Sequence, residues 1–449
     1  MTIDALRSAL AEVLPDARRD LEDLVRIPSL SCDPGSAAEV RRAADVVAAH
    51  AGAAGAADVQ IVSAGGAPAV IAIWPAPEGA PTVLLYAHLD VQPTGPLSEW
   101  TTPPFEPTER DGRLYARGAA DDKAGVLMHL AVLRAFGGRP PVGVVLFVEG
   151  EEEIGSPTLT ALLAEHRDLL RSDVIVIADS ANAAVDVPAF TTSLRGLVDL
   201  YVEVRLLERP VHSGMFGGPA GDALTALCRL LATLHDDAGC VAVEGLHTGT
   251  SSAPDLDEAS YRADAGLVEG ARLLGRGTLA DRMWHGPAVS VIGLDAPSTT
   301  EASNVLLPRA RAKVSLRIGP GDEAGAAMKA LTQHLRDHAP WGAEVTVTAG
   351  SEGQPFALST EGDVYDVARQ AFADAYGNPA VEAGIGGSIP FIAEFARTYP
   401  GATVMVTGVG DPASRWHGID ESLDLAMWQR ACLAEALFLS RLAGSSATQ

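Results

Sequence analysis

The chain has 449 residues, of which 47% are hydrophobic and 20% are charged, so it is long enough for two or three globular domains and too apolar to be disordered. Its 58 acidic and 33 basic residues give a formal net charge of −25, which argues against a nucleic-acid or anionic membrane partner. The four cysteines are scattered and form no C-x-x-C pair. Together with an N-terminus that lacks signal-peptide features, this predicts a cytoplasmic protein without disulfides or a membrane span.

The first part of the chain combines helical patterns with short apolar runs. Apolar residues at helical spacing predict a helix from Leu6 to Val25, ended by Pro28, and a second over Ala37–Ala53. Strands and further helices are then expected in the order strand Val59–Val62, strand Ala69–Trp74, strand Thr82–His88, strand Leu114–Ala116, helix Ala124–Phe136, strand Val142–Val148, helix Leu159–Leu170 and strand Val174–Ala178. This alternation predicts an α/β domain with a mostly parallel (mixed) sheet and helices on both faces.

The pattern changes after Arg195-Gly196. The next elements are predicted as strand Leu197–Leu206, helix Asp222–Leu234, strand Ala288–Leu294, strand Ala310–Ile318, helix Gly325–His338 and strand Glu344–Ala349. The order β-α-β-β-α-β is the ferredoxin-like arrangement, and the Gly-rich acidic segment Asp236–Gly286 is expected to be an irregular insertion in it.

The α/β pattern resumes near Phe356, with helix Gly362–Tyr376, strand Thr403–Thr407 and helix Leu423–Leu442. We therefore expect an α/β domain formed by residues 1–195 and 355–449, interrupted by an inserted α+β domain of residues 196–354.

Polar side chains follow five of the predicted strands. They are His88 and Asp90, Asp121 and Asp122, Glu151–Glu153, Asp179, and His417 with Glu421. Functional groups in open parallel sheets collect at the carboxyl ends of strands, so we expect these side chains to converge.

Such a cluster of carboxylates needs a cation. Clustered, desolvated carboxylates repel one another, and ligands that mix imidazole with carboxylate suit zinc, manganese or cobalt. The number of ligands is sufficient for two metals that share one bridging carboxylate. Spacing of two residues puts His88 and Asp90 on one face of an extended chain, so Asp90 can orient the imidazole. Of Glu152 and Glu153, one can bind metal while the other serves as a base.

Each of these signals has a structural alternative. A single His-x-Asp is more typical of an ordinary turn, and an acidic triplet such as Glu151–Glu153 is most often a solvated surface. Asp is common in turns after strands, which applies to Asp179, and an isolated histidine such as His417 is more often structural. The joint occurrence at successive strand ends is what favours a metal centre.

Six segments resemble a known family, the co-catalytic di-zinc metallopeptidases that include carnosinase, bacterial dipeptidases, carboxypeptidase G, aminoacylase and succinyl-diaminopimelate desuccinylase. The segments begin at Tyr86-Ala-His88-Leu-Asp90, Arg117-Gly-Ala-Ala-Asp121, Glu149-Gly-Glu-Glu152-Glu153, His212-Ser-Gly, Gly386-Gly-Ser388 and His417-Gly-Ile-Asp-Glu421. The resemblance runs nearly end to end and is greatest to the carnosinase-like dipeptidases. It implies that the inserted domain is a lid and dimerisation domain.

The resemblance also implies roles for individual residues. His88, Asp121 and Asp179 would bind one metal, and Glu153, His417 and the shared Asp121 the other. Asp90 would orient His88, and Glu152 would be the general base. His212 would stabilise the oxyanion across a dimer interface, Arg317 would pair with the substrate carboxylate, and Asn304, Gly387 and Ser388 would contact the substrate.

The expected reaction is hydrolysis of dipeptides by a cytoplasmic homodimer that carries two divalent ions, zinc first and manganese or cobalt as alternatives. Asp179 favours a dipeptidase, because many deacylases of this family have Glu there. Gly384 and Ile385 replace the Arg-Glu of many carnosinase-like members, so hydrolysis of N-acyl or N-carbamoyl amino acids stays open as the alternative. A non-catalytic metal-stabilised protein is a third reading, and no G-x-G-x-x-G supports dinucleotide binding.

Overall fold

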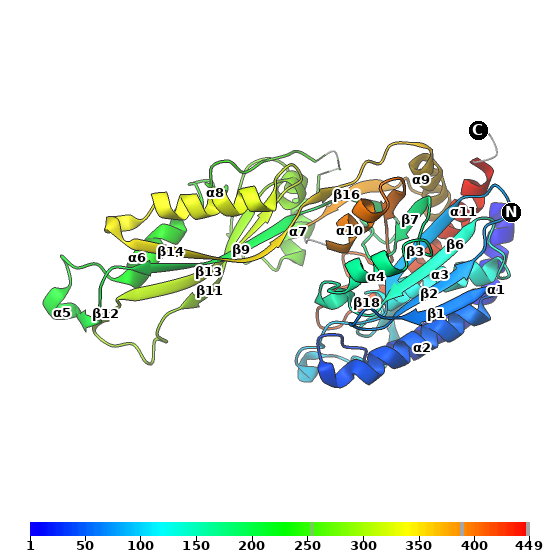
Figure 1. Ribbon diagram of the computed structural model, residues 1–449, viewed down its shortest axis with the longest axis horizontal. Coiled ribbons are helices and arrows are strands. Elements are labelled where there is room, and N and C mark those ends of the chain that lie inside the picture. Colours follow the sequence, from blue (N-terminus) through cyan, green and yellow to red (C-terminus); the bar gives the residue numbers. More distant parts are fainter. Residues whose placement is uncertain (252, 254, 387–389, 446–449) are drawn as a thin grey trace. The chain divides into compact units, whose positions relative to one another are not determined.

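The computed structural model describes residues 1–251, 253, 255–386 and 390–445 (Figure 1). It divides the chain into two compact units. Within the described residues, the first unit contains 1–192, 358–383 and 390–445, and the second contains 193–357 and 384–386. The sequence analysis had placed residues 384–386 in the α/β domain. They belong to the second unit because Ile385 and Gly386 accept hydrogen bonds from Arg195 through their carbonyls.

The first unit is built on a mixed sheet with the strand order β1-β2-β6-β3-β7-β17. These strands are β1 (Asp58–Val62), β2 (Ala69–Trp74), β6 (Gly143–Glu149), β3 (Thr82–His88), β7 (Val174–Ile177) and β17 (Thr403–Val406). The four strands from β6 to β17 are parallel to one another, whereas β1 and β2 are antiparallel to their neighbours. The expectation of a mostly parallel, mixed sheet is thus confirmed. All residues of β6 are buried, as is typical of a central strand covered on both faces.

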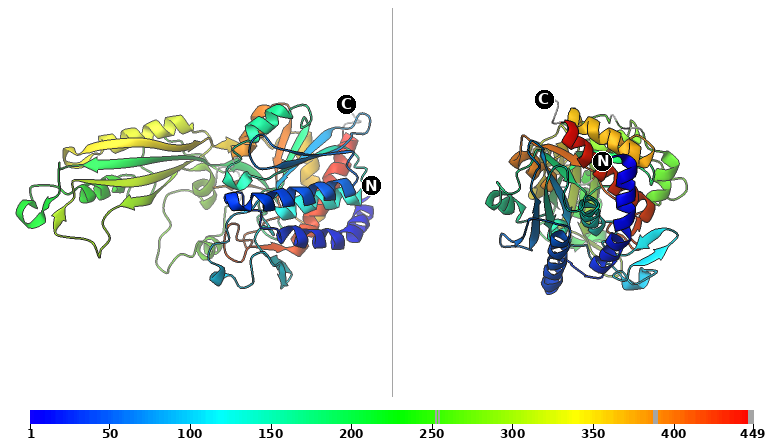
Figure 2. Two further views of the ribbon diagram at one scale, coloured as in Figure 1. Left: turned by 60° about the horizontal axis from the view of Figure 1, so that its bottom comes forward. Right: turned by 90° about the vertical axis from the view of Figure 1, so that its right-hand side faces the viewer.

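Helices cover both faces of this sheet (Figure 2). They are α1 (Ile3–Val25), α2 (Ala37–Ala53), α3 (Lys123–Ala135), α4 (Leu159–Glu165), α9 (Asp363–Tyr376), α10 (Pro390–Thr398) and α11 (Leu425–Ser445). On one face α3 packs on β3, and α1 and α11 pack on α3. Side chains alternate along β3, so Leu85 joins the core under these helices while Tyr86 stacks on Phe391 of α10, with ring centroids 4.6 Å apart. Both faces of the strand that ends at His88 are therefore fixed by packing.

A buried histidine–glutamate contact lies next to β3. Nδ1 of His129 on α3 is 2.7 Å from a carboxylate oxygen of Glu435 on α11, and its Nε2 is 3.2 Å from the carbonyl oxygen of Tyr86. Both side chains are buried. This contact connects two helices to the strand that carries the first candidate metal ligand.

The second unit has an antiparallel sheet with the strand order β11-β13-β9-β14. In chain order its elements are β9 (Gly196–Arg205), α6 (Ala223–Ala232), β11 (Ala288–Asp295), β13 (Arg309–Ile318), α8 (Ala324–Asp337) and β14 (Glu344–Gly353). This is the predicted β-α-β-β-α-β order. Alternate residues of β9 and β13, such as Val202 and Val314, form a core with α6 and α8, and the residues between them lie on the opposite face of the sheet.

Short elements complete the described chain. One three-stranded sheet contains β4 (Thr108–Arg110), β5 (Arg113–Tyr115) and β18 (Ser422–Asp424), and another contains β8 (Ala189–Leu194), β15 (Phe356–Ala357) and β16 (Val381–Ile385). The pair β10 (Val211–His212) and β12 (Val305–Leu306) lies beside the short helix α5 (Ser213–Phe216). No helix of the described residues is both long and apolar enough to cross a membrane.

Two sequence predictions were wrong in detail. Helix α4 ends at Glu165, not at Leu170, because the carbonyl of His166 accepts hydrogen bonds from Leu169 and Leu170 in a turn. The segment expected to be irregular contains helix α7 (Glu258–Asp264) and a π-helical turn over Asp281–His285. Their N-termini are held by carboxylates: Asp257 accepts from the Ser260 amide, and Asp281 accepts from the Thr278 amide.

Candidate metal centre

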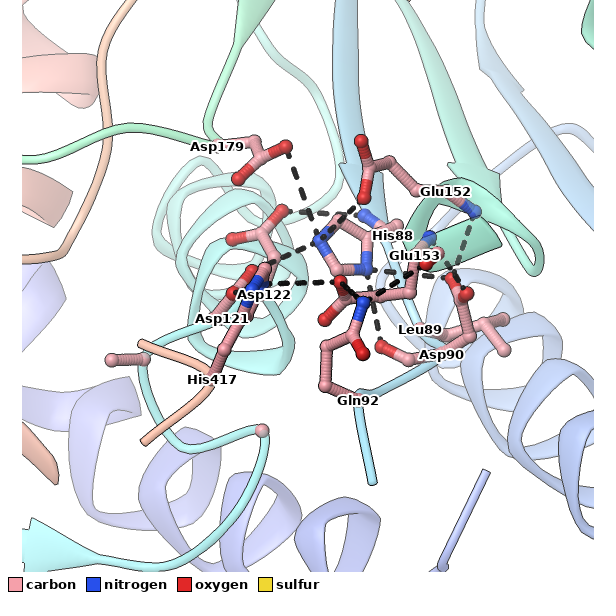
Figure 3. Close-up of polar contacts among 12 residues, drawn as sticks. His88, Leu89, Asp90, Gln92, Asp121, Asp122, Glu152, Glu153, Asp179 and His417 are labelled. Atoms are coloured by element: carbon pink, nitrogen blue, oxygen red, sulfur yellow. Dashed lines mark hydrogen bonds and ion pairs between the residues drawn. The ribbon is translucent and has the colours of Figure 1, made fainter. Parts of the chain in front are cut away.

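The polar residues singled out in the first unit meet at one edge of its sheet (Figure 3). His88 is the last residue of β3, and Asp179 follows β7. Glu152 and Glu153 lie in a short 3₁₀ helix directly after β6, and Asp121 lies in the loop before α3. His417 follows β17. Because β6, β3, β7 and β17 are parallel neighbours, their carboxyl ends bring these side chains together, as expected.

Asp121 lies between the two histidines. Its Oδ1 is 3.1 Å from Nε2 of His88, and its Oδ2 is 3.0 Å from Nε2 of His417. Nε2 of His417 is also 3.2 Å from Oε2 of Glu153, while Nε2 of His88 is 4.0 Å from Oδ2 of Asp179. One carboxylate thus presents one oxygen to each of the two histidines.

Two groups of potential ligands have all their donor atoms within 4.8 Å of one another. One is His88, Asp121 and Glu153, and the other is His88, Glu152 and Asp179. Imidazole and carboxylate donors in this number fit divalent zinc, manganese or cobalt better than calcium or magnesium. The donor set is therefore able to hold divalent cations.

Asp90 and Gln92 hold the ligands in place. The Asp90 carboxylate accepts hydrogen bonds from the backbone amides of Glu152 and Glu153, at 3.2 and 3.0 Å, and lies 3.4 Å from Nδ1 of His88. Nε2 of Gln92 donates to the carbonyl oxygen and to Oε2 of Glu153, both at 2.9 Å. The role of Gln92 was not foreseen, although it continues the two-residue spacing that pointed to His88 and Asp90.

The adjacent glutamates point to different partners. Glu151 is buried, and its carboxylate accepts hydrogen bonds from the amides of Ala67 and Thr158, each at 2.8 Å. Oε2 of Glu152 instead lies 4.0 Å from Nε2 of His88. Of the two, only the Glu152 side chain faces the ligand cluster.

The pKa shifts of the site residues reflect burial and repulsion among the carboxylates. Burial, followed by repulsion from Asp179, raises the pKa of Glu152 well above its usual range. Burial likewise raises the pKa of Asp179 to about 7. Burial opposes charge on Asp121 too, but hydrogen bonds with His417 and His88 lower its pKa. Hydrogen bonds to Asp121 and Glu153 raise the pKa of His417 to about 10. A divalent cation would offset the same repulsion.

A second carboxylate fixes the Asp121 loop. Glu421 is fully buried and accepts hydrogen bonds from the backbone amides of Gly118, Ala120 and Asp121, at 3.0 to 3.1 Å, and from Nη1 of Arg117 at 2.6 Å. Glu421 follows His417 by four residues. Its hydrogen bonds therefore connect the His417 loop to the backbone of Asp121. The sequence placed Glu421 in a motif but gave no partner for it.

The remaining candidates belong to the second unit. His212 is exposed, and its Nδ1 accepts a hydrogen bond from the Gly214 amide. Asn304 is exposed nearby, with its carbonyl accepting from the Ser213 amide at 2.9 Å. Arg317 is half-buried on β13, opposite Leu197 of β9. Gly387 and Ser388 lie outside the described residues.

Comparisons with known proteins give matches in sequence and in fold. The profile of "Peptidase family M20/M25/M40" matches residues 84–441. The chain is 39% identical over 367 residues to a cysteinylglycine-S-conjugate dipeptidase of Corynebacterium striatum, covering 80% of this chain and 81% of that one. The structure of human carnosine dipeptidase 1 is similar over 99% of both chains, with a TM-score of 0.80 and 26% identity. The Saccharomyces cerevisiae dipeptidase Dug1p has the same fold, with a TM-score of 0.80 at 21% identity over 99% of both chains.

Removal of divalent cations should destabilise the protein. Chelation leaves the carboxylates of the site without a compensating charge, so we expect the melting temperature to fall by on the order of 5 °C or more. Excess zinc, manganese or cobalt should restore it, and calcium should restore less because imidazole is a poor calcium ligand. Differential scanning calorimetry with elemental analysis checks this. Equal melting temperatures before and after complete removal of bound metal would contradict the assignment.

Proposed function

The chain belongs to peptidase family M20/M25/M40, and from this premise we propose that it is a metal-dependent dipeptidase that hydrolyses dipeptides or very short peptides. The observation that carries the proposal is Asp121, whose two oxygens face His88 and His417 on opposite sides. A carboxylate in this position is suited to bridge two cations.

We assign the ligands by the family pattern. His88, Asp121 and Asp179 would hold one ion, and Glu153, His417 and Asp121 would hold the other, zinc first and manganese or cobalt as alternatives. Such ions would supply an activated water and polarise the scissile carbonyl.

Glu152 is the proposed general base. Its side chain faces the ligands, whereas Glu151 is occupied by Ala67 and Thr158. In this proposal Glu152 takes a proton from water and then gives one to the leaving amine. The Asp90 carboxylate positions Glu152 by accepting a hydrogen bond from the Glu152 backbone amide. It positions His88 by its contact with Nδ1 of the imidazole.

The second unit supplies the substrate contacts in this proposal. Arg317 pairs with the substrate carboxylate, because a guanidinium binds a carboxylate through two parallel hydrogen bonds. His212 stabilises the oxyanion, and Asn304, Gly387 and Ser388 contact the substrate.

The positions of these contacts support a homodimer. His212 pairs with Val305 in β10 and β12, just before β13 begins at Arg309, whereas Arg317 lies near the other end of β13. Eight residues of extended strand span about 26 Å, which is longer than a dipeptide. We therefore propose that the Arg317 end of one chain works with the His212 end of a second copy.

A second candidate activity is hydrolysis of N-acyl or N-carbamoyl amino acids. The observation that favours it lies at Gly384, where an added Cβ would be 2.4 Å from Cγ of Trp284. No side chain fits there, and Ile385 carries no charge to meet a free amino group. The dipeptidase proposal is preferred because the relatives with high similarity are named dipeptidases. The scattered free cysteines support a cytoplasmic location.

A substrate panel separates the two activities. Zinc-, manganese- and cobalt-loaded protein should release amino acids from free dipeptides and act more slowly on N-acetyl and N-carbamoyl amino acids. Amino-acid analysis of the products gives the ratio. Turnover of blocked compounds alone would replace the dipeptidase proposal by the alternative.

Substitution Glu152→Gln tests the base. The amide keeps the size of the side chain but cannot accept and return a proton, so we expect kcat to fall by about 10²–10⁴ while metal content is unchanged. Glu151→Gln is the matched control, and its effect should appear in stability because its partners are structural. Activity retained in Glu152→Gln refutes the assigned base.

Mixed dimers test the contribution of His212 in trans. Chains with His212→Ala and chains with Glu152→Gln should each be nearly inactive. Co-expression in equal amounts should restore about a quarter of wild-type activity, because half of the dimers then contain one intact site. Light scattering gives the oligomeric state. Absence of any recovery in verified mixed dimers rules out the trans arrangement.

A further inference from the structure

Two arginines meet on one face of the second unit's sheet. Arg317 on β13 lies directly opposite Leu197 on β9, and Arg195 precedes Leu197 by two residues. Residues two apart in an extended chain share a face, which makes Arg195 a diagonal neighbour of Arg317, within reach of long side chains. This is the face opposite the core of α6 and α8.

Within the described part of the chain, neither guanidinium has a carboxylate partner. Arg195 donates from Nε to the Gly386 carbonyl at 3.3 Å and from Nη1 to the Arg282 carbonyl at 3.5 Å, so its hydrogen bonds go to neutral oxygens. No carboxylate of a described side chain forms an ion pair with it or with Arg317. Both side chains are half-buried.

Their electrostatic situation is unfavourable. Burial and then repulsion from Arg317 lower the pKa of Arg195 to about 10, and burial lowers that of Arg317. Two positive charges are thus held close together in a partly dehydrated place, and among the described side chains only the Tyr261 hydroxyl partly offsets the charge of Arg195.

Three other shielded arginines have acidic partners: Arg117 lies 2.6 Å from Glu421, Arg113 lies 2.8 Å from Asp411, and Arg134 lies 2.6 Å from Asp20. Arg282 and Arg430, which are also partly buried, donate to backbone carbonyls. Arg195 and Arg317 differ from both groups because they lie beside each other with no carboxylate partner among the described residues. A ligand can supply the counter-charge.

The surroundings of Arg195 suit a bound small molecule. An added Cβ at Gly386 would lie 2.9 Å from Nη2 of Arg195, so the guanidinium lies against bare backbone. Ala288, the residue opposite Arg317 on β11, follows the turn Asp281–His285 that provides the Arg282 carbonyl. Backbone at Gly386 and at the Arg282 carbonyl therefore lies against Arg195.

We propose that Arg195 and Arg317 together bind a dicarboxylate, so that the enzyme prefers dipeptides whose C-terminal residue is Glu or Asp. This inference rests on the proposed dipeptidase function and on Arg317 as the contact of the substrate α-carboxylate. One carboxylate neutralises one guanidinium, and the acidic side chain of the same residue neutralises the second. Arg195 is thereby a specificity-determining residue.

The test compares isosteric substrates. For wild-type protein, kcat/KM for Ala-Glu should exceed that for Ala-Gln by at least about tenfold, the usual size of a charge-assisted hydrogen bond in a shielded site. Arg195→Gln should bring the ratio close to one. Arg311→Gln is the control. Arg311 lies on the same strand and face as Arg317, but it is exposed and stacked on Tyr201. The Ala-Glu to Ala-Gln ratio of this variant should equal that of the wild type.

Binding of products gives an independent readout. L-Glutamate should bind metal-loaded protein at least about tenfold more tightly than L-glutamine by calorimetry, and Arg195→Gln should abolish the difference. This binding measurement tests the inference even if the protein cleaves no dipeptide. A lack of dipeptide cleavage would count against the proposed function alone. Equal values for Glu and Gln in wild type overturn the inference. So does an Arg195→Gln variant that loses activity on both substrates equally, since Arg195 would then only support the Gly386 backbone.

Discussion

Repulsion among carboxylates at the end of one sheet is the constraint on which the site depends. Asp121, Glu152, Glu153 and Asp179 are brought together by parallel strands, and the chain places two imidazoles between them without neutralising them fully. The carboxylates stay in place despite this repulsion because other residues hold them. Glu421 fixes the backbone of Asp121, Asp90 fixes both glutamate amides, and packing on both faces of β3 fixes His88. Divalent cations bound there, as we propose, would offset that repulsion.

The two units have different roles in the proposed mechanism. In the first, the strand ends provide groups able to hold cations and transfer a proton. In the second, Arg317 and His212, the proposed contacts of the substrate carboxylate and the oxyanion, lie at distant points of the same unit. This separation is the reason why the proposal includes a second copy of the chain. The proposed substrate preference follows in the same way from Arg195, which has no carboxylate partner among the described residues.

Much of the first unit could be predicted from sequence because its signals are local. Short β-branched runs gave strands, and polar residues after them gave the cluster of His88, Asp121, Glu153, Asp179 and His417. The β-α-β-β-α-β order of the second unit followed in the same way. Pairings across long sequence distances could not be predicted. The contacts of Glu421 with the Asp121 loop and of Glu151 with Ala67 depend on tertiary structure. The lack of a carboxylate beside Arg195 among the described residues is likewise visible only when its neighbours are known. Helix α7 was missed because its apolar periodicity is weak.

The central claim is that Asp121 bridges two cations. Anomalous diffraction at the zinc edge, from crystals of zinc-loaded protein, measures this directly. The account predicts two peaks about 3.5–4 Å apart, with one Asp121 oxygen bound at each and with His88 and His417 on opposite sides. A single peak, or two peaks of which Asp121 contacts only one, would contradict it.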